Sequence, residues 1–188
     1  MEKTIFEEKL SELEKTQSDF WNIPRVTGEL INSLIKSHGF KNILEIGTSN
    51  GYSALWIADA VKYTGGKLTG IEFYTKRIVL AEQNLNECGL SEYVNIVQGR
   101  ALEVLETLDE EYDMVFIDAS KAEYIKYYQK IRNQLKQNGL LVADNVDSHR
   151  EKVQDFMDAI YEDKAFQVSH IAYPAGLLLA FKVGKTEA

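Results

Sequence analysis

The sequence is poor in the features that stabilise secreted proteins or anchor a chain in a membrane. Its 188 residues include one cysteine, Cys88, so no disulfide can form within the chain. A lone cysteine fits a reducing compartment, and we expect the protein to be cytoplasmic. No apolar stretch approaches the roughly 20 residues that a helix needs to cross a bilayer. Residues 1–10 lack the basic start and apolar run of a signal peptide, so we expect neither a signal peptide nor a membrane partner.

The chain also lacks an excess of positive charge. Its 21 Lys and Arg residues are outnumbered by 29 Asp and Glu residues, which gives a formal net charge of −8. Non-specific affinity for nucleic acids comes mainly from Lys and Arg contacts to phosphates. The charge balance therefore argues against a long polyanionic partner, although it does not exclude a local basic patch.

What the sequence does contain is a regular alternation of apolar segments that begins at residue 41. Before it, residues 1–17 and the segment that starts at Pro24 have apolar residues at helical spacing and predict two helices. Beyond it, short apolar runs predict strands and amphipathic segments predict helices. The predicted strands are 42–46, 67–72, 93–98, 112–118, 140–144, 166–172 and 177–183. The predicted helices between them are 53–62, 75–88, 101–108, 122–136 and 150–161.

This alternation predicts an α/β fold, because strands that alternate with helices form parallel sheets. The last two strands are separated only by a Pro-Ala-Gly turn and should be antiparallel neighbours. We predict a Rossmann-like, seven-stranded, mostly parallel sheet with one antiparallel strand and helices on both faces. The length suits a single domain over residues 1–188, with N-terminal helices over 1–40 and the α/β core over 41–184.

A glycine-rich turn follows the first core strand, in the segment Glu45-Ile-Gly-Thr-Ser-Asn-Gly51. Glycines let the main chain turn sharply and let a ligand approach it, and in parallel α/β sheets ligands bind at such turns. The spacing is G-x-x-x-G, with Thr48 where the dinucleotide fingerprint has its second glycine. Glu45 would repel a pyrophosphate, but it suits a cationic group such as the ammonium or sulfonium of S-adenosylmethionine.

Glu72 ends the next predicted strand. A carboxylate at that position can accept both ribose hydroxyls of an adenosine. Together with the glycine turn, it favours S-adenosylmethionine as the ligand. The alternative is that Glu45 and Glu72 are solvated strand-end residues and that the glycines only form a tight turn.

Two further predicted strands end in polar residues, Asp118 in one case and Asp144-Asn145 in the other. If these strands are neighbours, about 4.8 Å apart, the three side chains converge at one edge of the sheet. Two carboxylates and an amide oxygen suit a hard cation such as Mg²⁺. Lys121 follows closely enough to return to the same site, where it can act as a general base. The alternative is that the acidic residues merely cap helices.

Three motifs together resemble the cation-dependent O-methyltransferases, the group of catechol and caffeoyl-CoA O-methyltransferases and their bacterial relatives. They are Glu-Ile-Gly-Thr-Ser-Asn-Gly-Tyr-Ser at 45–53, Phe-Ile-Asp-Ala-Ser-Lys at 116–121 and Ala-Asp-Asn at 143–145. The resemblance covers about residues 20–183. It implies a homodimer and the transfer of a methyl group from S-adenosylmethionine to a hydroxyl of a small catechol-like or vicinal-hydroxyl acceptor.

The resemblance also implies roles for individual residues. Lys121 is the catalytic base and Asp118 assists it. The residues implied in holding the cation are Asp118, Asp144 and Asn145. Those implied in holding the cofactor are Glu45, Gly47, Thr48 and Ser53 at its methionine part, the backbone near Ile23 closing over it, Glu72 at the ribose, the backbone of Ala101 at the adenine, and Asp118.

Two other functions stay open at this point. One is methylation of a hydroxylated uridine in tRNA, which the negative charge disfavours and which would need basic residues around the cleft. The candidates for such a patch are Lys62, Lys67, Lys76, Arg77, Lys121, Lys126 and Arg150. The other is a non-catalytic, cofactor-binding subunit that works by dimerising; the intact set of acidic residues and lysine counts against it.

The chain departs from the family pattern in segments where relatives recognise substrates, so the resemblance does not name the acceptor. These departures are the short segment before Ile23, Arg100, residues 146–150 and residues 173–177. We interpret His149 as a surface residue, and we assign no convergent partner to His38 or His170. Three nearby tyrosines, Tyr124, Tyr127 and Tyr128, could line a substrate cleft, but their helical spacing favours core or interface packing.

Overall fold

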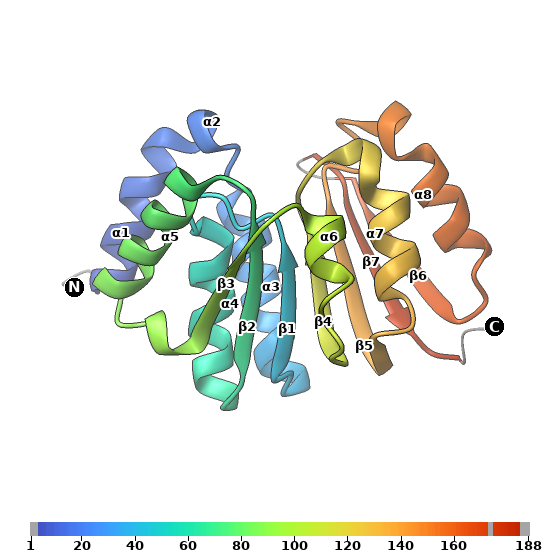
Figure 1. The fold of residues 1–188 in the computed structure, drawn as a ribbon, viewed down its shortest axis with the longest axis horizontal. Helices are drawn as coiled ribbons and strands as arrows, with labels where there is room; N and C mark the ends of the chain where they lie inside the picture. The colour runs from blue at the N-terminus through green and yellow to red at the C-terminus, as the bar shows by residue number, and fades with distance from the viewer. Residues whose placement is uncertain (1–3, 173–174, 185–188) are drawn as a thin grey trace.

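The structure is a computed structural model that describes residues 4–172 and 175–184 (Figure 1). The described residues form a seven-stranded sheet in the order β3-β2-β1-β4-β5-β7-β6. Strands β1 to β5 pair in parallel, whereas β7 is antiparallel to both β5 and β6. The predicted Rossmann-like fold with one reversed strand is therefore confirmed.

The strands and helices alternate along the chain as the sequence predicts. The strands are β1 (Asn42–Ile46), β2 (Lys67–Glu72), β3 (Val94–Gln98), β4 (Tyr112–Ile117), β5 (Leu135–Asp144), β6 (Phe166–Ile171) and β7 (Leu177–Lys182). The α-helices are α1 (Ile5–Leu13), α2 (Gln17–Phe20), α3 (Arg25–His38), α4 (Tyr52–Thr64), α5 (Thr75–Glu87), α6 (Ala101–Leu105), α7 (Tyr124–Ile131) and α8 (Arg150–Glu162). Short 3-10 turns lie at η1 (Glu14–Thr16), η2 (Ser91–Tyr93) and η3 (Lys121–Glu123).

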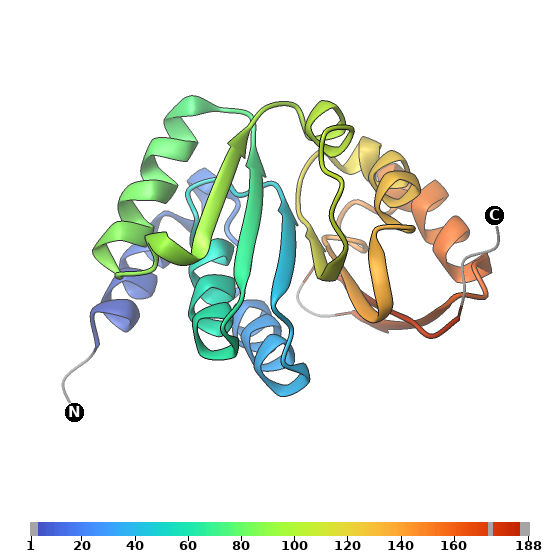
Figure 2. The same cartoon turned by 60° about the horizontal axis from the view of Figure 1, so that its bottom comes forward.

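The sheet separates two hydrophobic layers, because successive side chains of a strand point to opposite faces. In β1, Ile43 packs with residues of α3 and α4, whereas Leu44 and Ile46 pack with residues of α7 and α8. Helices α1 and α5 join the first layer and α6 joins the second. Both faces of the sheet are thus covered by helices (Figure 2).

The structure corrects the boundary between the helix predicted over 122–136 and the strand predicted over 140–144. The helix α7 ends at Ile131, and β5 already begins at Leu135, which pairs with Tyr112. A buried lysine at the end of β7 explains the early stop: Lys182 Nζ donates to the carbonyls of Arg132 and Leu135, at 2.8 and 2.6 Å. This long-range contact cannot be inferred from local periodicity.

Two other predicted helices are shorter than expected. The helix predicted over 1–17 breaks after Leu13 into η1 and the four-residue α2, and the helix predicted over 101–108 ends at Leu105. Among the described residues, no helix has the length and apolar character that crossing a membrane requires.

Candidate active site

A cavity of about 980 Å³ opens at the carboxyl ends of the parallel strands. It runs from the glycine turn and Glu72 to Asp118 and Asn145, on the upper side of the sheet in Figure 1. Most of the predicted site residues line this cavity: Ile23, Gly47, Thr48, Ser53, Glu72, Ala101, Asp118, Lys121 and Asn145. Glu45 and Asp144 are not among the residues that line it, and they are 0% and 2% exposed. The topology therefore brings the sequence-predicted residues to one place.

The glycine turn is held tightly against the end of β4. Gly47 has φ 99°, a backbone conformation that favours glycine, and a Cβ there would lie 2.3 Å from the carbonyl oxygen of Asp118. The amides of Gly47 and Thr48 both donate to the carbonyl of Ile71, at 3.0 and 3.1 Å. The turn is thus fixed between β2 and β4, with its remaining polar groups along the cavity.

Replacing Gly47 by alanine is expected to destabilise the protein and to weaken ligand binding at the turn. The new Cβ adds a left-handed backbone cost of about 1–2 kcal/mol and an overlap with Asp118 costing roughly 1–3 kcal/mol more. Gly65→Ala is the matched control, because Gly65 also has a positive φ of 72° but no neighbouring atom within 4 Å of its Cβ position. Denaturant unfolding should show the larger loss for Gly47→Ala; equal losses would mean that the overlap is relieved without cost.

Glu72 ties the glycine turn to the end of β2. One carboxylate oxygen accepts the amide of Ser49 at 2.8 Å, and the other accepts the amides of Phe73 and Tyr74, each at 2.8 Å. The carboxylate is nearly buried but reaches the cavity. An ionised carboxylate accepts about four hydrogen bonds, so Glu72 keeps capacity for a ligand hydroxyl.

Glu45 is a fully buried carboxylate. Among the described residues, neither of its oxygens has a hydrogen-bond partner. Burial raises the pKa of Glu45 to about 7, the carboxylates of Asp118 and Glu72 act in the same direction, and the nearby hydroxyls of Ser53 and Thr48 oppose the shift. Such a group is stabilised by a cation placed beside it. The ammonium or sulfonium group of the expected ligand would be such a cation.

Asp118 and Asp144 occupy matching positions on neighbouring strands. The register pairs Ile117 with Ala143, so the two aspartates follow side by side at the ends of β4 and β5. One oxygen of Asp144, Oδ1, has no hydrogen-bond partner among the described residues. Burial raises the pKa of Asp144 to about 7, and the charge of Asp118 adds to the effect.

These residues fit a divalent cation. The buried, unpartnered carboxylate oxygen of Asp144 lies at the strand edge that it shares with Asp118, and Asn145 follows with φ 63°. No cluster of three His, Cys, Asp or Glu residues suited to a metal occurs in the described parts of the chain. The donor set is instead two carboxylates and an amide, which a hard cation completes with water or ligand oxygens.

Lys121 lies in η3 and returns to the end of β4 as expected. Its Nζ is 2.5 Å from Asp118 Oδ1 and donates to the hydroxyl of Tyr124 at 3.0 Å. That hydroxyl is also within 3.2 Å of the Ile117 carbonyl and 3.0 Å of the Asp144 carbonyl, and it donates its one proton to one of them. Tyr124 therefore connects the ends of β4 and β5 to the lysine.

The role of Tyr124 goes beyond the sequence interpretation. Tyr124, Tyr127 and Tyr128 are buried, so the preference for core packing is confirmed. The spacing of three residues between Lys121 and Tyr124 is the signal that could have placed this hydroxyl at the site, because residues three apart on a helix are neighbours. Tyr127 lines the cavity as well and donates its hydroxyl proton to Glu123 at 2.8 Å.

Two segments that depart from the family pattern pack against each other at the β5 end of the cavity. The amides of Val146 and Asp147 donate to the carbonyls of Gly176 and Ala175, each at 3.0 Å. His170 Nε2 lies 2.9 Å from Asp147 Oδ2, so the expectation that His170 has no partner is wrong. Of the C-terminal segment, Tyr173 and Pro174 lie outside the described residues.

His149 is exposed, as interpreted from the sequence, and it also lines the cavity. Burial lowers its pKa, and the charges of Lys121 and Lys152 add to this effect. His149 and Lys121 therefore line the same cavity, so both can contact a ligand bound in it.

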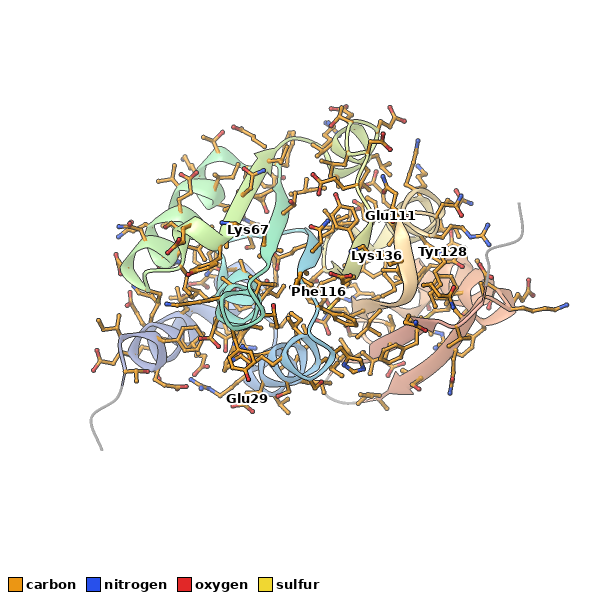
Figure 3. The ribbon with its side chains drawn as sticks, turned by 90° about the horizontal axis from the view of Figure 1, so that it is seen from below. Glu29, Lys67, Glu111, Phe116, Tyr128 and Lys136 are labelled. Carbon is orange, nitrogen blue, oxygen red and sulfur yellow. The ribbon has the colours of Figure 1, made fainter. Side chains whose placement is uncertain are left out.

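Within the described parts of the chain, the basic residues do not form a ring around the cavity mouth. Of the seven candidates, Arg77 and Lys121 line the cavity, and Lys121 is paired with Asp118. Lys67 begins β2, at the opposite edge of the sheet, where Figure 3 also shows Glu111 and Lys136. Arg100, one of the departures, is a further basic residue that lines the cavity.

The family model of the O-methyltransferases matches residues 2–183, nearly the whole chain. The chain belongs to the O-methyltransferase family. Two relatives of the chain are catechol O-methyltransferases. The one from Niastella koreensis is 38% identical over 123 residues, and the one from Mycobacterium tuberculosis is 33% identical over 135 residues. The matches cover 63% and 69% of this chain, which spans 55% and 61% of the two relatives' lengths.

Solved structures of other O-methyltransferases share the fold. The O-methyltransferase TomG from Streptomyces achromogenes, solved in complex with SAM, is 28% identical and superimposes with a TM-score of 0.85 over 94% of this chain and 90% of its own. An O-methyltransferase from Bacillus cereus in complex with SAH is 23% identical, with a TM-score of 0.86 over 97% and 92% of the two chains. At that identity the second structure shows the fold alone.

Proposed function

We propose that this protein is an S-adenosylmethionine-dependent O-methyltransferase that methylates a hydroxyl of a small catechol-like or vicinal-hydroxyl acceptor with the help of a divalent cation, Mg²⁺. One observation carries the proposal: a single cavity joins the glycine turn, Glu72 and the Asp118–Lys121 pair. Beside Asp118, on the neighbouring strand, lies Asp144, whose Oδ1 has no hydrogen-bond partner among the described residues. A small acceptor suits a cavity of this size, whereas a folded RNA needs a broad basic surface.

The cofactor-binding half of the proposal rests on Glu45, Glu72 and the glycine turn. S-adenosylmethionine supplies an electrophilic methyl group on a sulfonium. The turn offers backbone groups and the hydroxyls of Thr48 and Ser53, Glu72 offers free acceptor capacity for the ribose, and Glu45 favours positive charge. The TomG complex supports the same ligand, because that relative of the same fold was solved with SAM.

The catalytic half rests on Lys121 and its surroundings. Asp118, Asp144 and Asn145 would hold the cation, which when bound favours ionisation of a neighbouring acceptor hydroxyl and fixes the orientation of vicinal oxygens. The uncharged amine form of Lys121 takes up the hydroxyl proton at Nζ, and the adjacent Asp118 carboxylate stabilises the resulting ammonium. Tyr124 holds Nζ in place during the transfer.

Other parts of the proposal come from the family resemblance and the composition. We propose a homodimer in the cytoplasm, with a hydroxylated tRNA uridine as a less favoured acceptor and a non-catalytic binding role as the least favoured function. Because Arg77 and Arg100 are the cavity-lining arginines, a basic surface large enough for tRNA is not evident among the described residues.

The proposal is tested by following a labelled methyl group from S-adenosylmethionine. The acceptors are a panel of catechols and, separately, bulk tRNA, each with Mg²⁺ and with a chelator. We expect label in a catechol product, with Mg²⁺ required for full rate. Transfer to tRNA alone would show that the acceptor is tRNA and not a small catechol. Full activity with the chelator would show that no divalent cation takes part. Absence of S-adenosylmethionine binding in calorimetry would overturn the proposal as a whole.

A further inference from the structure

A tryptophan in an unfavourable backbone conformation stands at the mouth of the cavity. Trp21 follows the short helix α2 with φ 54°, a left-handed conformation that is rare for bulky residues, and its side chain lines the cavity. The residue is 73% exposed. A large aromatic side chain in strained backbone and in water stabilises the free protein little, which points to a role in a bound state.

The surrounding hydrogen bonds impose this conformation. The amides of Trp21 and Asn22 both donate to the carbonyl of Gln17, and the Gln17 side-chain amide donates back to the Asn22 carbonyl at 3.0 Å. Asn22 is itself anchored, since its side chain donates to the Leu13 carbonyl at 3.3 Å. These hydrogen bonds fix the backbone of Trp21 so that its side chain lines the cavity, and none of them involves the indole.

The indole meets an arginine from the other side of the cavity mouth. The guanidinium carbon of Arg77, in α5, lies 5.2 Å from the centre of the Trp21 ring and 5.3 Å from that of Tyr74. Arg77 forms no ion pair with the described acidic residues, and Tyr74 is exposed. The three side chains form a cation–π stack, here called the Trp21–Arg77–Tyr74 stack, which joins α2 to the start of α5.

The stack lies across the part of the cavity where the cofactor is proposed to bind. On one side, Ser49 of the glycine turn donates its hydroxyl proton to the carbonyl of Phe20, the residue before Trp21. On the other side, Tyr74 donates its amide to Glu72. Trp21, Tyr74 and Arg77 therefore line the same cavity as Ser49 and Glu72, which are themselves joined at 2.8 Å.

We propose that the Trp21–Arg77–Tyr74 stack is a gate that opens for the nucleoside cofactor to enter, closes over it and slows its release. This inference rests on the proposed function, because it takes the occupant to be S-adenosylmethionine or its demethylated product. A cation–π contact strengthens when water is excluded. Closure over a bound nucleoside buries the indole and strengthens its contact with Arg77, so dissociation of the product requires that contact to break.

Tryptophan fluorescence tests the gate, because the chain has two tryptophans and the other, Trp56, is only 6% exposed. We expect saturating S-adenosylhomocysteine to reduce acrylamide quenching of Trp21 severalfold. The signal is assigned by difference from Trp21→Phe and, independently, from Trp56→Phe, in which Trp21 is the sole tryptophan. Unchanged quenching in a complex that calorimetry shows to be saturated would overturn the gate and leave the proposed function standing.

Release kinetics give a second test. Arg77→Gln and Trp21→Asn should each speed dissociation of S-adenosylhomocysteine in stopped-flow by roughly 5- to 30-fold, the factor that corresponds to a cation–π contact of ordinary to desolvated strength. Asparagine tolerates the left-handed region, so Trp21→Asn should not lower the unfolding midpoint. A lowered midpoint with unchanged release would show that the stack is only structural.

The chain supplies a matched control for these variants. Tyr63, at the end of α4, is 76% exposed and carries a cation–π contact from Lys36 at 5.8 Å, but it does not line the cavity. Tyr63→Asn should leave release unchanged; faster release in this variant would contradict a local gate. Failure of the wild-type protein to bind S-adenosylhomocysteine would remove the proposed cofactor, and with it the gate.

Discussion

Replacing Lys121 by methionine is expected to lower kcat for a catechol acceptor by about 10²–10⁴-fold, the usual contribution of a general base. Lys121 is the basic side chain paired with Asp118 at the cavity, and its Nζ is held by Tyr124. The affinity for S-adenosylhomocysteine should change little, because Lys121 is not among the predicted cofactor contacts. Steady-state kinetics and calorimetry on the same preparation separate the two effects.

Lys121→Arg distinguishes proton transfer from simple electrostatics. Arginine keeps the positive charge beside Asp118 but does not give up its proton in proteins. The arginine variant should therefore be about as slow as the methionine variant. If it retains most of the activity, Lys121 acts by its charge and is not a base. Lys126→Met, at an exposed position of α7, is the control and should retain wild-type turnover.

Glu45→Gln is expected to stabilise the ligand-free protein while weakening cofactor binding. The pKa of Glu45 is raised to about 7 from 4.5, so the stability that this group contributes is present below pH 4.5 and is lost as pH rises through 7. Glutamine has no such loss. Above pH 7 the variant should exceed the wild type in free energy of unfolding by up to about 3 kcal/mol, from 1.36 kcal/mol per pKa unit.

The pH dependence provides the check on this assignment. Denaturant unfolding at pH 4.5, 6 and 8 should show a difference between variant and wild type that grows with pH. Calorimetry at pH 8 should show weaker binding of S-adenosylmethionine to the variant, because the neutral amide no longer favours a cation. A variant that is less stable than wild type at pH 8 would show that Glu45 is compensated by contacts absent from the described structure.

The sequence was sufficient where one local signal determined one local structure. The turn after β1 needed Gly47, since the carbonyl of Asp118 leaves no space for a side chain, and the glycine spacing revealed it. The adjacency of Asp118 and Asp144 followed from strand order, because parallel neighbours end at the same edge. These two inferences account for most of the candidate site.

The remaining features depend on contacts between distant segments. The end of α7 is determined by Lys182, some 50 residues further along the chain than Arg132, whose carbonyl it binds. The partnership of His170 with Asp147 depends on the packing of β6 beside the loop after β5. The position of Trp21 depends instead on local hydrogen bonds to the carbonyls of Gln17 and Leu13, which no periodic pattern encodes.

The reversed strand has a consequence for how the protein matures on the ribosome. Strand β7 inserts between β5 and β6, and Leu177 pairs directly with Asp144. Until residues 177–182 have left the exit tunnel, β5 lacks its β7 neighbour and Asp144 lacks its strand partner Leu177. The carboxylate beside which the cation is proposed to bind is therefore covered on that side only after β7 has emerged and paired. In a nascent chain the glycine turn would emerge early, whereas the site at the ends of β4 and β5 would be completed last.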